Sequence, residues 1–147
     1  MSFSELPFQK LHPSAKVPTR ANATDAGLDL TALNSTLIPA GFRILVGTGL
    51  AVALPAGLVG SIRPRSGLAN NHGVTVLNSP GTIDSGYRGE IKVLLYNSSL
   101  TDYMVTAGDR IAQLVCEVIA LPTPLEVDEL PEAIDQRGAG GFGSTGK

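Results

Sequence analysis

The segment Gly81-Thr82-Ile83-Asp84-Ser85-Gly86-Tyr87-Arg88-Gly89-Glu90 places one carboxylate and one aromatic ring on either side of two small residues. Ser85-Gly86 suits a tight hairpin turn, because glycine adopts a positive φ without steric cost. Such a hairpin would hold Asp84 close to Tyr87 on a rigid support. A carboxylate beside a ring suits a general base next to a flat heterocycle. The alternative is a surface hairpin in which Asp84 only stabilises the turn.

A second informative segment, Arg63-Pro64-Arg65-Ser66-Gly67-Leu68, follows an apolar run at Leu58–Ile62. Pro64 should end that strand, because it cannot donate to a ladder. Ser66 is a candidate N-cap of a short helix, and Gly73 a candidate stop. Arginines beside the free N–H groups of a helix start would form an anion site. The alternative is an ordinary capped helix with solvated arginines.

Residues 137–147, Arg-Gly-Ala-Gly-Gly-Phe-Gly-Ser-Thr-Gly-Lys, are dominated by glycine: five of the ten residues 137–146. Such a segment cannot bury a core and is expected to be mobile without ligand. Its free N–H groups and its arginine could wrap a polyphosphate while Phe142 covers a ring. The alternative is a disordered end without function. We expect a β-domain at residues 1–136, including a Pro- and acid-rich arm at 121–136, and a mobile lid at 137–147.

Composition limits the class of protein. The chain has 147 residues, of which 43% are hydrophobic and 16% are charged, as expected for one globular domain. The net charge of −2 argues against nucleic acid as a partner. No apolar run approaches the length of a membrane span, so no membrane partner is expected. The single cysteine, Cys116, fits a reducing compartment, and we expect a cytoplasmic protein with this side chain in a structural role.

Short β-like runs separated by Gly, Pro or Asn fill most of the chain. Many short strands with regular turn signals indicate an all-β domain, a distorted jelly roll or β-barrel. The only predicted helix is the short one that follows Ser66. The predicted strands are Leu28–Thr31, Thr36–Ile38, Arg43–Gly47, Leu50–Leu54, Leu58–Ile62, Val74–Leu77, Glu90–Tyr96 and Arg110–Ile119.

Five segments in order resemble the motifs of the trimeric deoxyuridine triphosphate nucleotidohydrolases, or dUTPases. They are Ala23–Leu30, Arg63–Leu68, Gly81–Glu90 preceded by Asn78, Gly108–Leu114 and Arg137–Gly146. Together they span nearly the whole chain, and their order makes the match very specific. One departure is Gly86, which stands where many members carry aspartate. We expect this difference to alter the shape of the turn more than its chemistry.

The resemblance implies a dUTP diphosphatase that forms dUMP and pyrophosphate, keeping uracil out of DNA and supplying dUMP for thymidylate synthesis. By the resemblance, Asp84 activates the water that attacks the α-phosphate, and Tyr87 packs under the deoxyribose and excludes a 2′-hydroxyl. Groups around Asn78 would read uracil. The residues that match the substrate-binding positions of the family are Arg65, Ser66, Gly67, Asn78, Thr82, Ile83, Asp84, Tyr87, Lys92, Gln113, Arg137, Phe142 and Gly143.

The resemblance also implies a Mg²⁺ ion bound through the substrate triphosphate, with no direct protein ligand. Asp25 and Gln113 would lie in the outer shell of the metal. Their alternatives are structural: Asp25 as a turn residue and Gln113 as an interface hydrogen bonder. The family forms homotrimers with sites between subunits, in which the tail of one chain closes the site of a neighbour.

Two other functions remain open. A dCTP deaminase has the same fold, but its members typically carry Arg-Ser-Ser in place of Arg65-Ser66-Gly67 and lack the glycine-rich tail. A nucleotide-responsive binding or regulatory protein would signal without turnover, and the presence of Asp84 argues against it. His12 and His72 have no supporting constellation, and Asp29 and Asp109 are expected to be mainly structural.

Overall fold

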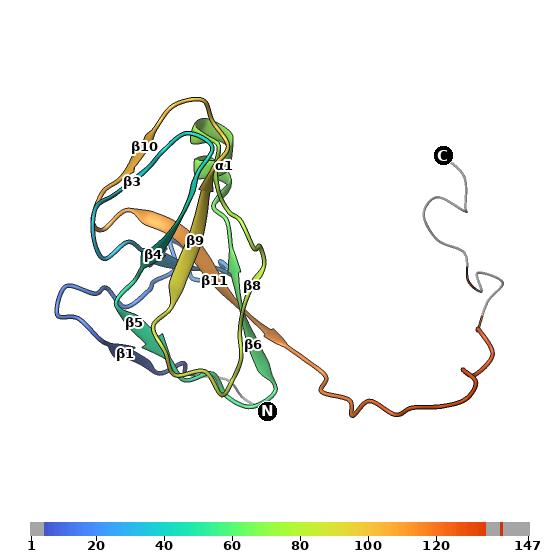
Figure 1. Ribbon diagram of the computed structural model, residues 1–147. Coiled ribbons are helices and arrows are strands. Elements are labelled where there is room, and N and C mark those ends of the chain that lie inside the picture. Colours follow the sequence, from blue (N-terminus) through green and yellow to red (C-terminus); the bar gives the residue numbers. More distant parts are fainter. Residues whose placement is uncertain (1–4, 135–138, 140–147) are drawn as a thin grey trace.

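Short antiparallel strands make up most of this computed structural model, which describes residues 5–134 and 139 (Figure 1). The predictions of an all-β architecture and one short helix are confirmed for these residues. The strands are β1 Phe8–Lys10, β2 Leu28–Thr31, β3 Thr36–Ile38, β4 Arg43–Gly47, β5 Leu50–Val52, β6 Leu58–Arg63, β7 Val74–Val76, β8 Gly81–Ile83, β9 Lys92–Asn97, β10 Tyr103–Val105 and β11 Arg110–Val118; the helix is α1 Ser66–His72.

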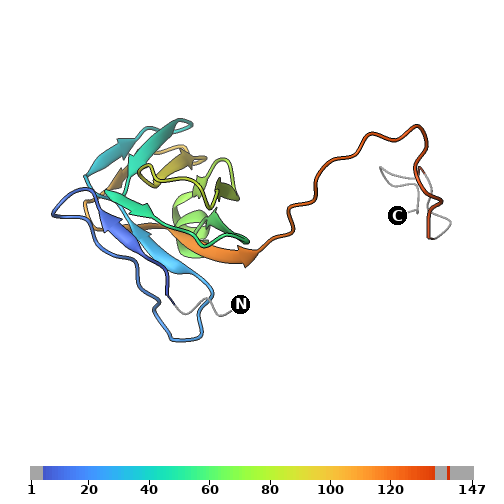
Figure 2. The same ribbon diagram turned by 90° about the horizontal axis from the view of Figure 1, so that it is seen from below.

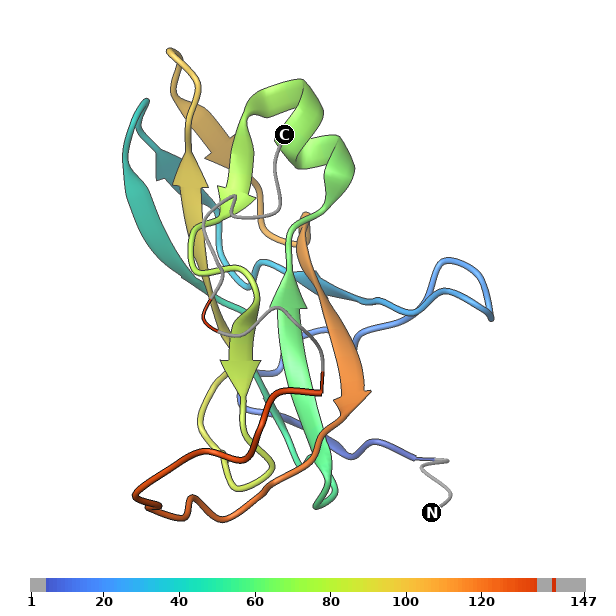
Figure 3. The same ribbon diagram turned by 90° about the vertical axis from the view of Figure 1, so that its right-hand side faces the viewer.

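Two larger sheets enclose the core. One has the strand order β2-β11-β6-β8 and the other β4-β9-β7, and the pairs β1-β5 and β10-β3 complete the barrel-like wall. Figure 3 shows β6 and β11 side by side, in agreement with their six-residue antiparallel register from Gln113↔Arg63 to Val118↔Leu58. Aliphatic side chains fill the interior, and Leu30, Leu50 and Leu114 are fully buried. The predicted jelly-roll-like barrel is therefore confirmed.

Alternation along the strands explains which side chains enter the core. In β9 every second residue from Val93 to Asn97 is buried, as expected for a strand with one face on the core. Asn97 is the polar exception, and its amide donates to the carbonyls of Ile38 (3.0 Å) and Thr101 (2.8 Å). The side chain thereby satisfies its buried donors and ties β9 to β3.

The predicted strand bounds agree closely with the structure where turn residues closely flank an apolar segment. The bounds of β2, β3 and β4 are as predicted, whereas β5 ends at Val52 and β9 begins at Lys92. Three strands of three residues each, β1, β8 and β10, were not predicted. Their pattern is too short to show a period, and pairing with distant strands defines them.

The hairpin predicted for residues 81–90 is wrong. β8 pairs with β6, whereas β9 pairs with β4 and β7, so the segment crosses between two sheets. A β-turn does form, because the Tyr87 N–H donates to the Asp84 carbonyl at 3.0 Å. Gly86 does not have the positive φ expected of it. A loop between sheets does not need the primed turns that match strand twist in a hairpin.

The predicted N-cap is also wrong, whereas the predicted helix end is confirmed. Arg65 is the N-cap of α1, with φ −94° and ψ 127°, and no side chain caps the helix start. Ser66 already lies within the helix, because the extended chain after Pro64 continues through Arg65. Gly73 ends the helix in the left-handed conformation, with φ 65° and its N–H directed at the carbonyls of Ala69 and Leu68.

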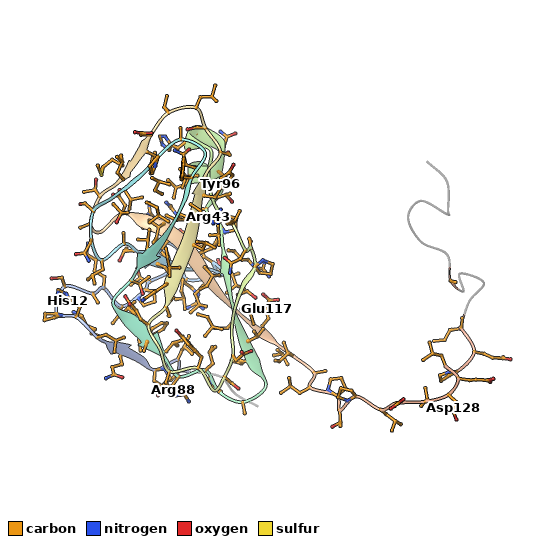
Figure 4. All side chains as sticks on the ribbon, viewed as in Figure 1. His12, Arg43, Arg88, Tyr96, Glu117 and Asp128 are labelled. Carbon is orange, nitrogen blue, oxygen red and sulfur yellow. The ribbon has the colours of Figure 1, made fainter. Side chains whose placement is uncertain are left out.

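After β11 the chain leaves the domain as an extended arm, residues 119–134. Figures 1 and 2 show this arm running away from the sheets, and Asp128 in Figure 4 lies far from every strand. Its apolar side chains Leu121, Leu125 and Leu130 are 75–85% exposed. The predicted site residues Arg137, Phe142 and Gly143 lie outside the described residues. None of the helical structure in the described part has the length and hydrophobicity that crossing a membrane requires.

Candidate active site

A pocket of about 240 Å³ lies along β8. All three residues of β8 line it, together with Asn78, Tyr87 and Lys92, and apolar side chains that include Leu45 and Leu94 complete its wall. β8 is an edge strand, since among the described strands only β6 pairs with it. Its free edge offers backbone donors and acceptors next to an apolar wall. This combination suits a flat polar ring.

Asp84 is the next residue in the sequence after Ile83, which lines this pocket. The Asp84 side chain is exposed, and no described residue donates a hydrogen bond or ion pair to its carboxylate. Its backbone carbonyl holds the turn through Tyr87 N–H, as described above. The main chain of Asp84 is therefore fixed, and its carboxylate remains available to a water or ligand.

A second pocket, of about 370 Å³, is lined by charged and polar residues from β2, β11 and the start of α1. Two arginines line this pocket, and the Asp29 carboxylate contacts both of them. Its Oδ1 lies 3.4 Å from Nε of Arg65, and its Oδ2 lies 3.0 Å from Nη1 of Arg110. Arg65 also donates to the Arg110 carbonyl at 3.1 Å. Two guanidinium groups thus share the Asp29 carboxylate, and their planar N–H donors suit an anion such as phosphate, although Asp25 balances the formal charge of the pocket lining.

Gln113 is held in this second pocket by two neighbours. Its Nε2 donates to the Pro64 carbonyl at 2.9 Å, linking β11 to the segment before α1. Its Oε1 lies against Gly27, where any Cβ would overlap it. The amide keeps one N–H beyond the bond to Pro64, and this group is a donor for a ligand.

Asp25 also lines the second pocket but belongs to a tight turn. Its carboxylate Oδ2 accepts from the Asn22 N–H at 2.8 Å and from Asn22 Nδ2 at 3.1 Å. Within residues 5–134, no group of three or more His, Cys, Asp or Glu side chains could form a metal cage. Both oxygens keep lone pairs beyond these bonds, so Asp25 can still accept from water.

The predicted site residues thus gather in two places. Asn78, Thr82, Ile83, Tyr87 and Lys92 line the first pocket, and Asp25, Arg65, Ser66, Gly67 and Gln113 line the second. No described residue lines both pockets. Sequence reasoning missed the contribution of Asp29 and Arg110 to the second pocket. Their pairing depends on the register of β2 with β11, which places Arg110 opposite Thr31 across a β-bulge.

Cys116 lies away from both pockets, in a cavity of about 320 Å³ between the N-terminal segment and β11. Its side chain is partly buried and packs against the core. Burial raises the pKa of the Cys116 thiol above its ordinary value, and the positive charge of Arg20 opposes this effect. A raised pKa agrees with the structural role expected from the sequence.

The family model described as dUTPase matches residues 13–146, which is most of the chain. The chain belongs to the dUTPase family. The deoxyuridine 5′-triphosphate nucleotidohydrolase of Nocardia farcinica is 51% identical over 146 residues, covering 99% of this chain and 87% of that protein. The enzyme of the same name from Wolinella succinogenes is 54% identical over 138 residues, covering 94% and 91%.

Solved dUTPase structures have the same fold as this dUTPase-family chain. A mutant dUTPase of Staphylococcus bacteriophage 80alpha, solved with dUpNHpp, superposes with a TM-score of 0.91 at 27% identity, covering 98% of this chain and 99% of that one. A mutant dUTPase from phage phi11 of S. aureus, whose structure shows coordination of a structural Mg(II) ion, superposes with a TM-score of 0.82 at 25% identity, covering 87% and 99%. The likeness extends over the whole barrel.

Proposed function

We propose that this chain hydrolyses dUTP to dUMP and pyrophosphate. The observation that carries this proposal is the pocket along the free edge of β8, with the Tyr87 ring in its wall. The Asp84 carboxylate, which pairs with no described residue, directly follows β8 in the chain. Membership of the dUTPase family and the names of the relatives from Nocardia and Wolinella support the same reaction.

Asp84 is the proposed general base. A carboxylate accepts a proton from water when it is ionised, and the exposed position of Asp84 gives water access. The water then attacks the α-phosphorus, and pyrophosphate leaves. No described residue competes for the carboxylate, so its lone pairs are free to orient the water.

The pocket along β8 is the proposed uracil site. Backbone groups of Thr82 and Ile83 and the Asn78 amide would pair with the edge of the base. Cytosine presents the reversed pattern of donor and acceptor at its ring edge, so binding it would leave buried polar groups unpaired. A site built on such groups discriminates strongly between bases. Tyr87 would pack under the sugar, and Lys92 lies at the same wall.

The second pocket is the proposed phosphate site. Arg65 would bind phosphate oxygens together with Ser66, Gly67 and the remaining donor of Gln113. The described residues do not form a cage for a bare cation, and the two carboxylates of this pocket are balanced by its two arginines. The pocket fits Mg²⁺ that arrives on the triphosphate and keeps most of its waters. Asp25 and Gln113 would hold those waters, and the ion would neutralise phosphate charge; the Mg(II) ion in the phage phi11 enzyme supports a metal.

The complete site is proposed to form between the subunits of a homotrimer. The two pockets share no described lining residue, so pocket residues of two chains could serve one substrate. The arm at residues 119–134 exposes apolar side chains away from its own domain, as reaching a neighbour requires. Residues 137–147, with Arg137, Phe142 and Gly143, would then close over the bound nucleotide, as a lid separate from the domain at 1–136.

Product analysis tests the proposed reaction. The protein is incubated with Mg²⁺ and either dUTP or dCTP, and products are separated by chromatography with a pyrophosphate assay. We expect dUMP and pyrophosphate from dUTP and no reaction of dCTP. Deoxyuridine nucleotides formed from dCTP would instead identify a deaminase. Lack of turnover with both would contradict the proposal and favour a binding protein.

A further inference from the structure

Glu90 links the loop after β8 to the turn between β4 and β5. Its Oε1 accepts a hydrogen bond from the Gly49 N–H at 2.9 Å, across 41 residues of sequence. Its Oε2 lies 3.6 Å from the ammonium group of Lys92. The Glu90 side chain is only 26% exposed, so this contact is partly shielded from water. The carboxylate therefore fixes the end of the loop against a separate part of the fold.

The backbone around Glu90 is fixed as well. The next residue, Ile91, donates its N–H to the Leu50 carbonyl at 2.7 Å and accepts from the buried Thr48 hydroxyl at 2.7 Å. Ile91 itself is 1% exposed. Glu90 therefore lies where the loop meets the buried core, and its backbone carbonyl is a hydrogen-bond acceptor in a fixed position.

The Tyr87 hydroxyl uses this acceptor. It donates to the Glu90 carbonyl at 3.0 Å. Tyr87 as a whole residue is 46% exposed, so core packing alone does not hold the ring. At the other end of the residue, the Tyr87 N–H bonds to Asp84. The place of the ring in the pocket wall therefore depends on two polar contacts, one of which ends on Glu90.

Two glycines make room for this arrangement. A Cβ at Gly89 would overlap the Tyr87 hydroxyl, and a Cβ at Gly47 would lie 2.6 Å from Glu90 Oε1. Neither glycine has a positive φ, so close approach rather than backbone conformation explains both. Figure 4 shows Arg88 of the same loop at the lower end of the domain, where its Nη1 donates to the Ser85 and Tyr87 carbonyls at 2.7 and 2.8 Å.

We propose that Glu90 is a positioning residue that sets the preference for deoxyribose over ribose, by holding the ring of Tyr87 through the Gly49 N–H and its own carbonyl. This inference rests on the proposed function. A ring that excludes a 2′-hydroxyl does so only while it cannot shift, because a displacement of about one ångström changes contacts with the reacting substrate substantially. Loss of the contact between Glu90 and Gly49 should therefore increase the hydrolysis of UTP more than it lowers the hydrolysis of dUTP.

Specificity constants for dUTP and UTP test the inference in three full-length variants. Glu90→Ala removes the acceptor for Gly49, Glu90→Gln keeps an acceptor oxygen but removes the charge, and Tyr87→Phe removes only the hydroxyl. One hydrogen bond corresponds to a change of about three- to tenfold. We expect the dUTP/UTP ratio of kcat/KM to fall by about that factor in Glu90→Ala and Tyr87→Phe, and Glu90→Gln to restore it.

The outcomes separate this inference from the proposed function. Failure of the unmodified protein to hydrolyse dUTP would overturn both. A normal enzyme whose dUTP/UTP ratio is unchanged in Glu90→Ala and Tyr87→Phe would overturn only the role of Glu90. A parallel fall in both rates at constant ratio would show a purely structural contribution and overturn it too. Should Glu90→Ala not fold, Glu90→Asp takes its place, because the shorter side chain withdraws the carboxylate from the Gly49 N–H, and an unchanged dUTP/UTP ratio in that variant would overturn the role of Glu90.

Discussion

The Asp29 carboxylate lies 3.0 Å from the Nη1 atom of Arg110, although 81 residues separate them in the sequence. The pairing of β2 with β11 brings them together, and the same carboxylate also contacts Arg65. One acidic residue thereby orients two cations at the pocket proposed for the triphosphate.

Replacement of Asp29 by asparagine is expected to raise the KM for dUTP several-fold with little effect on stability. The amide keeps the shape but loses the charge that orients both arginines, and the ion pair with the half-exposed Arg110 contributes at most about 1 kcal/mol. Steady-state kinetics and urea unfolding measure the two effects. The matched control is Glu117→Gln, which breaks the exposed pair with Arg63 outside the pocket and should leave KM unchanged. Equal KM values in the two variants would argue against an orienting role for Asp29.

Replacement of Asp84 by asparagine should lower kcat on the order of 10²- to 10⁴-fold, the usual contribution of a general base. Binding of dUTP should persist, because the side chain keeps its size and the turn is held by backbone atoms. Calorimetric titration with a non-hydrolysable dUTP analogue measures affinity separately from rate. Near-normal turnover would remove Asp84 as the base.

Deletion of residues 137–147 should leave the fold intact and reduce kcat/KM on the order of 10²-fold, as expected when a closing segment is lost. The buried core of the domain comes from residues 15–114, so circular dichroism and thermal unfolding should match those of the full chain. An unaffected rate would show that the segment is not a lid.

Alkylation of Cys116 is expected to be slow in the folded protein. Burial raises the pKa of this thiol, so at pH 8 less of the reactive thiolate is present than in the unfolded chain. The contribution of this group to stability is full below the unfolded pKa and is lost as pH rises through the higher folded pKa. The rate of reaction with iodoacetamide between pH 7 and 10, with and without urea, measures the shift. A folded protein that reacts as fast as the unfolded one would contradict it.

Local sequence patterns predict those parts of the fold that local interactions determine. β2, β3 and β4 have the predicted bounds because clear turn signals flank each of these short apolar segments. The end of α1 at Gly73 follows from the freedom of glycine to adopt a positive φ. The family resemblance likewise identifies ten of the residues that line the two pockets, including Lys92, which lies just beyond the third motif.

Long-range pairing determines the rest. The segment 81–90 has the composition of a hairpin, yet β8 finds its partner in β6, more than fifteen residues earlier in the chain. The link of Asp29 to Arg110 and that of Glu90 to Gly49 each join distant segments. No local pattern contains that information. Ser66 shows the smaller error of one position, because the extended conformation continued through Arg65.

The free edge of β8 has an evolutionary consequence if it reads the base. Every amino acid except proline supplies the same main-chain N–H and carbonyl. Specificity for the base would therefore depend on the position of the backbone and not on the identity of the side chains. Substitutions at the exposed Thr82 would then drift neutrally while recognition persists. Selection would act instead on the contacts that keep this edge unpaired. If the edge of β8 paired with another strand, its backbone groups could no longer bind the base, and the protein would tend to aggregate.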